Sequence, residues 1–156
     1  MLRTLLALCM TGLLMVSCEK NKEPFYQVDV FETALHNQVN KYRQSQELSD
    51  LVFSHDIFIE ARQQSLAWKN SGDPASGLDA RMQTIQEHWE PTMLGVITAQ
   101  ASSKDTAVAR LVVESWVQDT TARSIITDDY VQSGPGIAVG EGGEVYITHF
   151  FMTIPD

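Results

Sequence analysis

The segment EVYITHFFMT at 144–153 constrains the fold more than any other stretch of this sequence. Its β-branched and aromatic residues predict a strand, in which successive side chains point to opposite faces of the sheet. Both faces of this strand are apolar: Val145, Ile147 and Phe151 lie on one, and Tyr146, Phe150 and Met152 on the other. Since each apolar face must be covered, the sequence predicts an α+β fold, a three-layer α/β/α sandwich with a small antiparallel sheet in the middle.

Four helices are expected to cover this sheet. Apolar residues recur at three- and four-residue steps over 28–46 and over 54–72, with Ser54 as the expected N-cap of the second helix. A third, short helix is expected after Ser76 and a fourth after Ser102, each with an aspartate at capping-box spacing. The expected buried stripe of the fourth helix is Val108, Leu111, Val112 and Trp116.

Two further segments predict strands. The β-branched stretch 92–99 is expected to form one of them. The stretch 136–140 is expected to pair with the last strand across a glycine-rich turn at 141–143.

The N-terminal residues predict export and a lipid anchor. Arg3 precedes an uncharged run that ends at Ser17, too short to span a bilayer but typical of a secretory signal. Met15-Val16-Ser17-Cys18 resembles a bacterial lipobox, whose cysteine is acylated after cleavage. We therefore expect a signal peptide at 1–17, a tether at 18–27 lipidated on Cys18, and one folded domain at 28–156. The alternative is that Cys18 is an ordinary residue of an uncleaved segment. Glu19 in place of an aspartate after Cys18 favours the outer membrane over the inner one.

Charge and cysteine content exclude several classes of function. The chain has 20 acidic and 11 basic residues, with a net charge of −9 and no basic cluster, so nucleic-acid binding is not expected. Its two cysteines, Cys9 and Cys18, both lie in the N-terminal segment. The folded domain therefore has no disulfide, no thiol nucleophile and no thiolate metal ligand.

The order of the expected elements, together with several short motifs, resembles the CAP superfamily, the SCP-like extracellular domain, in a bacterial lipoprotein form. The motifs are VNKYR at 39–43, LVFS at 51–54 followed by Ala61 and Trp68, GLDAR at 77–81, Trp116 followed by Arg123, GPGIA at 134–138 and the hairpin strand at 145–150. The resemblance spans 31–152 and implies a sandwich with a ligand cleft.

The residues expected in that cleft depart from the family pattern. Relatives that bind a metal there use two histidines with glutamates nearby. The corresponding positions here are Ala75 and Ala122, and the family glutamate falls within Leu94-Gly95-Val96. Because an alanine methyl can neither ligate a cation nor move a proton, we expect no metal, no cofactor and no catalysis.

The possible cleft contacts that remain are Glu114, His149, Arg81 and Arg123. Of these, His149 shares a strand face with apolar residues and is expected to be a hydrogen-bonded core histidine. Glu32, His36 and Asn40 share one face of the first helix, which we interpret as a solvated polar face rather than a binding stripe.

The sequence thus predicts an exported, lipid-anchored domain whose altered cleft binds a small hydrophobic ligand, a peptide or an envelope protein. Sterol and fatty-acid binding are implied only by the family resemblance. Two alternatives stay open. One is an envelope hydrolase with an unrecognised site, for which Glu114 and His149 are the candidate pair, and the other is a purely structural envelope lipoprotein.

Overall fold

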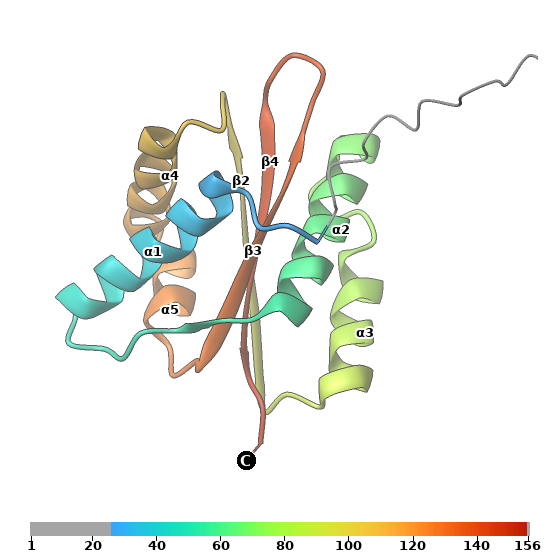
Figure 1. The fold of residues 1–156 in the computed structure, drawn as a ribbon. Coiled ribbons are helices and arrows are strands. Elements are labelled where there is room, and N and C mark those ends of the chain that lie inside the picture. Colours follow the sequence, from blue (N-terminus) through green and yellow to red (C-terminus); the bar gives the residue numbers. More distant parts are fainter. Residues whose placement is uncertain (1–25, 156) are drawn as a thin grey trace, which may run out of the picture.

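The protein is a sheet between two layers of helices, as Figure 1 shows for the computed structural model, which describes residues 26–155. The expected signal peptide, Cys18 and nearly all of the expected tether lie outside the described residues. One face of the sheet is covered by α1 (Val30–Ser45), α4 (Thr106–Gln118) and α5 (Thr120–Thr127), and the other by α2 (His55–Ser71) and α3 (Leu78–Trp89). The predicted α+β three-layer sandwich is therefore confirmed.

The sheet has the strand order β1-β3-β4-β2 and is mixed. Its strands are β1 (Val52–Phe53), β2 (Met93–Ala101), β3 (Gln132–Val139) and β4 (Val145–Thr153). The central strand β4 pairs antiparallel with both β2 and β3, which confirms the expected hairpin and the expected strand at 92–99. However, β1 pairs parallel with β3, so the expectation of a wholly antiparallel sheet is wrong. A two-residue strand is too short to leave a periodic signal in the sequence.

The two faces of β4 belong to separate apolar clusters, as its alternating pattern predicts. Val145, Ile147 and Phe151 pack with α1, α4 and α5, whereas Phe150 and Met152 pack with α2 and α3. In α4 the buried positions are Ala109, Val112, Val113 and Trp116. Leu111 is 52% exposed, so its expected place in the buried stripe is wrong.

Several helix ends differ from expectation. Ser54 stands at the N-cap position of α2, but its side chain makes no capping hydrogen bond. The N-cap of α3 is Gly77, with a positive φ of 73°, rather than Ser76. Asp105, not Ser102, caps α4 and accepts a hydrogen bond from the Ala107 N–H. The short helix α5 was not expected from the sequence.

A buried arginine joins α1 to the segment that follows α5. Arg43 is 2% exposed, and its guanidinium donates hydrogen bonds to the carbonyl oxygens of Ser49, Ile126 and Asp128 at 2.7–2.9 Å. With a longer hydrogen bond of 3.5 Å to the Tyr130 carbonyl, main-chain oxygens accept from four of the five donors of this side chain. This gives a structural role to the arginine of the VNKYR motif.

Candidate functional site

The polar face of α1 packs against the sheet rather than facing solvent. Glu32 is 0% exposed and His36 is 8% exposed. The interpretation of these residues as a solvated face is therefore wrong. The physical reason is that α1 contacts both α4 and β3, so its apolar face and its polar face are both covered. Burial of these polar groups requires a hydrogen-bond partner for each of them.

The Glu32 carboxylate holds together the two helical layers at one end of the sheet. The guanidinium of Arg62, on α2, donates two hydrogen bonds of 2.7 Å to it. The backbone N–H groups of Asp29 and Ile137 donate two more, at 2.7 and 3.0 Å. Burial raises the pKa of Glu32 above its ordinary value, while Arg62 and the backbone donors act in the opposite direction.

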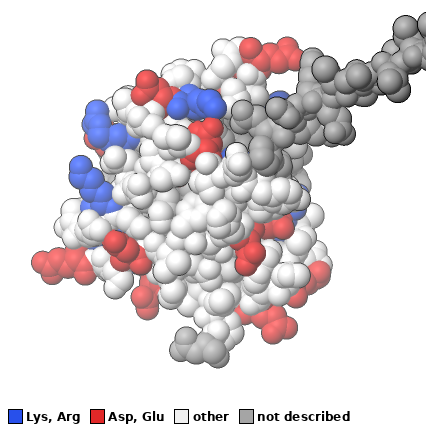
Figure 2. All heavy atoms as spheres, in the orientation of Figure 1, with Lys and Arg blue, Asp and Glu red and all other residues white. Residues whose placement is uncertain are grey.

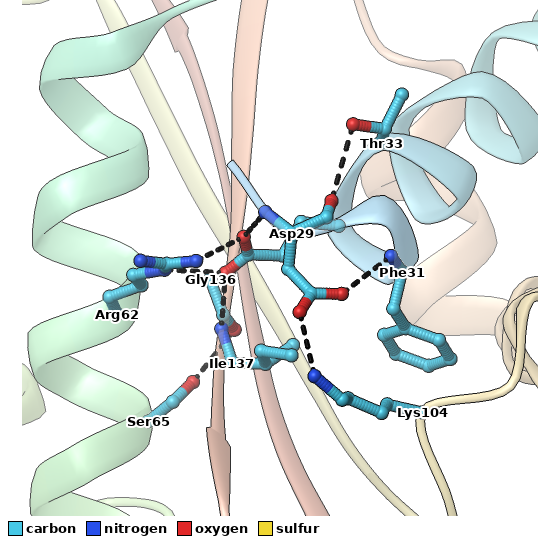
Figure 3. A network of polar contacts seen from close by, with 9 residues as sticks. Asp29, Phe31, Thr33, Arg62, Ser65, Lys104, Gly136 and Ile137 are labelled. Carbon is cyan, nitrogen blue, oxygen red and sulfur yellow. Dashed lines mark hydrogen bonds and ion pairs between the residues drawn. The ribbon is translucent and has the colours of Figure 1, made fainter. Parts of the chain in front are cut away.

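Figure 3 shows how Arg62 approaches this network from α2 and how Lys104 reaches it from the other side. Lys104 forms an ion pair with Asp29 at 2.9 Å. Although partial burial of Asp29 acts to raise its pKa, the hydrogen bond from the Phe31 N–H and the contact with Lys104 hold this pKa below its ordinary value. The network links α1, α2, β3 and the loop before α4.

A second buried network contains two histidines that share one serine hydroxyl. His36 Nδ1 lies 3.1 Å from Ser133 Oγ, and His149 Nε2 lies 3.0 Å from the same oxygen. His36 comes from α1, Ser133 from β3 and His149 from β4, with Ser133 and His149 fully buried. The expectation that His149 is a hydrogen-bonded core histidine agrees with this arrangement.

The hydrogen bonds of Asn40 define which ring nitrogen carries the proton in each of the two histidines. The Asn40 side-chain oxygen accepts from the Leu51 N–H at 2.8 Å, so its amide nitrogen faces His36 Nε2 at 3.2 Å. His36 Nε2 is then an acceptor, and its Nδ1–H donates to Ser133. The hydroxyl of Ser133 in turn donates to His149 Nε2, which leaves the proton of His149 on Nδ1.

Burial favours the neutral form of both imidazoles. Burial lowers the pKa of His36, although Asp50 and the backbone at Leu51 act to raise it. Burial, followed by the influence of His36, lowers the pKa of His149 well below its ordinary value. His149 Nδ1 has no hydrogen-bond partner among residues 26–155. A serine between two histidines has the groups of a nucleophile and a base, but Ser133 is 0% exposed, so no substrate can reach it.

A hollow of about 340 Å³ lies between β2, α4 and α5, and part of the cleft expected from the family resemblance falls in it. Ala122 lines this hollow together with Ile97, Trp116 and other residues. Gly95 does not line this hollow, and a Cβ at this position would lie 2.5 Å from the Tyr130 hydroxyl, so the Tyr130 side chain packs against the glycine. Ala75 is exposed in the loop between α2 and α3 and does not line the hollow.

The four expected cleft contacts do not converge on one site. Glu114 pairs with Arg110 on the exposed side of α4. Arg81 on α3 binds Glu60 and Gln63 of α2, and Arg123 donates to a backbone carbonyl at the end of α4. His149 lies in the core, with its ring 6.0 Å from that of Trp116 and stacked on Phe151. A role for these residues in ligand contact stays a prediction.

A second hollow, of about 370 Å³, lies in the groove between α1 and α4. Tyr42, Val113 and Val117 contribute apolar surface to it. Polar and charged side chains also line it: Gln38, Lys41, Ser45, Arg110, Glu114 and Gln118. This groove was not predicted from the sequence, because its two walls are far apart in the chain.

The capping pattern at the start of α1 was a signal that could have located part of the buried network. Asp29 followed three residues later by Glu32 has capping-box spacing, and the structure shows both of its hydrogen bonds. That spacing would have placed Glu32 in the first turn of α1. It could not have revealed Arg62 as the partner of Glu32.

The described part of the chain contains neither a cluster of metal ligands nor a membrane-spanning helix. Between residues 26 and 155, no group of three or more histidine, cysteine or acidic side chains is arranged to hold a metal ion. No helix in that range has both the length and the apolar character needed to cross a membrane.

Comparison with solved structures identifies the fold, although no family model and no curated protein matches the sequence. An outer surface protein of Borrelia burgdorferi superposes with a TM-score of 0.66 at 11% identity, over 82% of this chain and 97% of that one. An SCP-domain extracellular protein of Bacillus anthracis gives 0.61 at 17% identity, over 79% of this chain and 40% of that one. A cysteine-rich secretory protein of Staphylococcus aureus gives 0.61 at 15% identity, over 78% and 38%.

These matches define an α+β sandwich of the SCP-like class. The protein has the CAP-like fold, as the order of its motifs indicated. It spans about the whole length of the Borrelia protein but well under half of the other two.

Proposed function

We propose that this protein is an exported, lipid-anchored CAP-like domain that binds an apolar ligand in the groove between α1 and α4 and catalyses no reaction. The observation that carries the proposal is the groove itself. It combines the apolar surface of Tyr42, Val113 and Val117 with charged side chains at its rim. Its volume of about 370 Å³ falls in the usual range for small-molecule sites.

The chemistry of the rim suggests an amphipathic ligand with an acyl-type chain and an acidic head. Lys41 lines the groove and forms no ion pair with any residue between 26 and 155. Arg110 also lines it but is engaged by Glu114. An apolar chain would contact the two valines of α4, while a carboxylate would lie near the Lys41 ammonium. A peptide with an apolar side chain and an acidic neighbour meets the same requirements.

The proposed absence of catalysis rests on the cleft and on the buried histidines. The hollow between β2, α4 and α5 presents the methyl group of Ala122, and its one carboxylate, Asp119, accepts a hydrogen bond from the Ala122 N–H as the N-cap of α5. His36 and His149 are neutral, buried and hydrogen-bonded to Ser133. Neither constellation offers an accessible pair of acid and base to a substrate.

The proposed location is the bacterial cell envelope, with the lipid on Cys18 in the outer membrane. Its support is the signal-like run before the lipobox in the sequence. Neighbours in fold are described as an outer surface protein and as extracellular proteins, which is compatible with export.

Membrane fractionation tests the anchor. Cys18→Ser should release the protein from membranes, whereas Cys9→Ser should leave it there because Cys9 lies in the segment that is removed. Equal membrane retention of the two variants would refute lipidation at Cys18.

Titration with a fluorescent fatty acid tests the groove. Val117→Asp places a charge in the groove and should weaken binding by about tenfold or more, since a charge must then lose water or repel the ligand. Leu111→Asp is the matched control, because Leu111 is exposed on the same helix and does not line the groove. The proposal fails if the unmodified protein shows no saturable binding, or if both variants bind equally well.

A further inference from the structure

Exposed apolar side chains gather at the end of the molecule where the N-terminal tether joins the domain. Val30 at the start of α1 is 72% exposed, Leu66 on α2 is 41% exposed and Val139 at the end of β3 is 39% exposed. All three line one hollow of about 440 Å³. Gln27, close to the first described residue, lines the same hollow. We call the surface defined by Val30, Leu66 and Val139 the tether-end face.

The charged groups at this face are largely neutralised. Arg62 is bound to Glu32 and Asp29 is paired with Lys104, while Lys69 adds one further positive charge to the hollow. Glu141 and Glu144 follow Val139 in the turn between β3 and β4 and place negative charge beside it. Elsewhere, Figure 2 shows acidic side chains spread over the visible face, without an extended basic patch. Any membrane contact here must therefore depend on apolar surface rather than on attraction to anionic lipid.

The length of the tether limits how far this face can lie from an anchor on Cys18. Gln27 is the ninth residue after Cys18. A fully extended chain reaches about 3.3–3.6 Å per residue, so Gln27 stays within roughly 30 Å of the lipidated residue. Such a short link raises the effective concentration of the bilayer at the nearest surface of the domain. A contact between this surface and the bilayer can then form even if it is weak without the link.

We propose that the tether-end face lies against the bilayer that holds Cys18, with Val30, Leu66 and Val139 in contact with the lipid interface. The inference rests on the proposed anchor at Cys18 and adds an orientation of the domain to it. The bilayer is the occupant we infer because the chain enters the domain at this face and the anchor keeps the two within reach of each other.

Site-directed spin labelling of the lipidated protein tests this orientation. The domain after Cys18 contains no other cysteine, so a single label can be attached through Leu66→Cys or Val139→Cys. The labelled protein is reconstituted in vesicles of phosphatidylethanolamine and phosphatidylglycerol, and collision with a water-soluble nickel reagent is measured. Leu111→Cys, on the exposed side of α4, is the control label.

We compare the lipidated protein on vesicles with the Cys18→Ser protein in solution. On vesicles, the collision rate between the nickel reagent and the labels at 66 and 139 should fall roughly fivefold. The label at 111 should not change. Labels at 66 and 139 that stay as accessible as the label at 111 would overturn the orientation. Equal protection in the Cys18→Ser protein without vesicles would also overturn it, because the chain itself would then cover the face.

The anchor is checked separately by the mass of the acyl chains and by flotation with the vesicles. A protein without acyl chains contradicts the proposed anchor. A protein that floats but keeps its labels at 66 and 139 accessible contradicts only the orientation.

Discussion

Acidification is expected to destabilise this protein through the two histidines that share Ser133. The pKa of His36 is lowered and that of His149 is lowered well below the ordinary value of 6.5, mainly by burial. In the unfolded chain both regain their ordinary pKa, so the unfolded state binds more protons once the pH falls below about 6.5. The stability that depends on the neutral imidazoles is therefore present above that pH and is lost as the pH falls toward the folded pKa values.

The size of the effect follows from the same linkage. A histidine that stays neutral in the folded state down to pH 5 lowers the free energy of unfolding by about 2 kcal/mol between pH 7 and pH 5. His149 is expected to contribute about this amount, and His36 less, because its pKa is lowered less. A total of about 2–4 kcal/mol is a large part of the stability of an ordinary domain.

Other titrating groups define the useful pH window. The raised pKa of Glu32 opposes the histidine effect as the pH approaches 5, and the lowered pKa of Asp29 acts only at still lower pH. Asp50 acts to raise the pKa of His36 and so reduces its contribution. Urea unfolding between pH about 7.5 and 5 is therefore the best way to measure what the two histidines contribute to the change in the free energy of unfolding with pH.

The pH slope of stability is the quantity to measure in variants. His149→Gln should flatten this slope even though it lowers the absolute stability, while His88→Gln should leave it unchanged because His88 is exposed on α3. Nitrogen NMR of the rings should show both histidines as neutral Nδ1–H tautomers at pH about 7. The reasoning fails if His149 titrates near its ordinary pKa, or if His149→Gln keeps the slope of the unmodified protein.

Three further predictions concern the core, the metal and the buried ion pair. Trp116→Ala should cost about 3–5 kcal/mol in chemical denaturation, because the ring is buried and donates to the Thr98 carbonyl; a near-neutral result would contradict its place in the core. Added Zn²⁺ or Ca²⁺ should leave the melting temperature unmoved, and a saturable rise of several degrees would show a metal site. Glu32→Met alone should lose about 3–5 kcal/mol, and the double variant with Arg62→Leu should lose at least about 1 kcal/mol less than the sum of the two single variants, since the pair is removed only once while the Asp29 and Ile137 N–H groups stay without their acceptor in both; additive losses would contradict a coupled pair.

The sequence predicts the layers of this protein because each layer has a local signal. The alternation in β4 alone separates the residues of the two apolar clusters, and helical spacing places α1 and α2 within two residues of their observed ends. Features without such a period were not predicted. The strand β1 is two residues long, and α5 is separated from α4 by a single residue, Asp119, which caps both helices.

The buried polar networks escaped prediction for a different reason. Helical spacing shows that Glu32 and His36 share a face, but it does not show what lies opposite. Their partners Arg62, Ser133 and Ile137 are 30, 97 and 105 residues away along the chain. Only the fold brings such distant residues together, so spacing alone gave the wrong environment for this face of α1.

These networks also explain how a domain without a disulfide can fix the position of α1. Glu32 ties α1 to α2 through Arg62, His36 ties it to β3 and β4 through Ser133, and Arg43 ties its C-terminal end to the segment after α5. Desolvation offsets much of the hydrogen-bond energy of each link, so the links add less to stability than the apolar cores. Their geometry, however, is satisfied at only one register of α1 on the sheet. Since α1 forms one wall of the groove with α4, the buried polar links hold the proposed ligand site in shape.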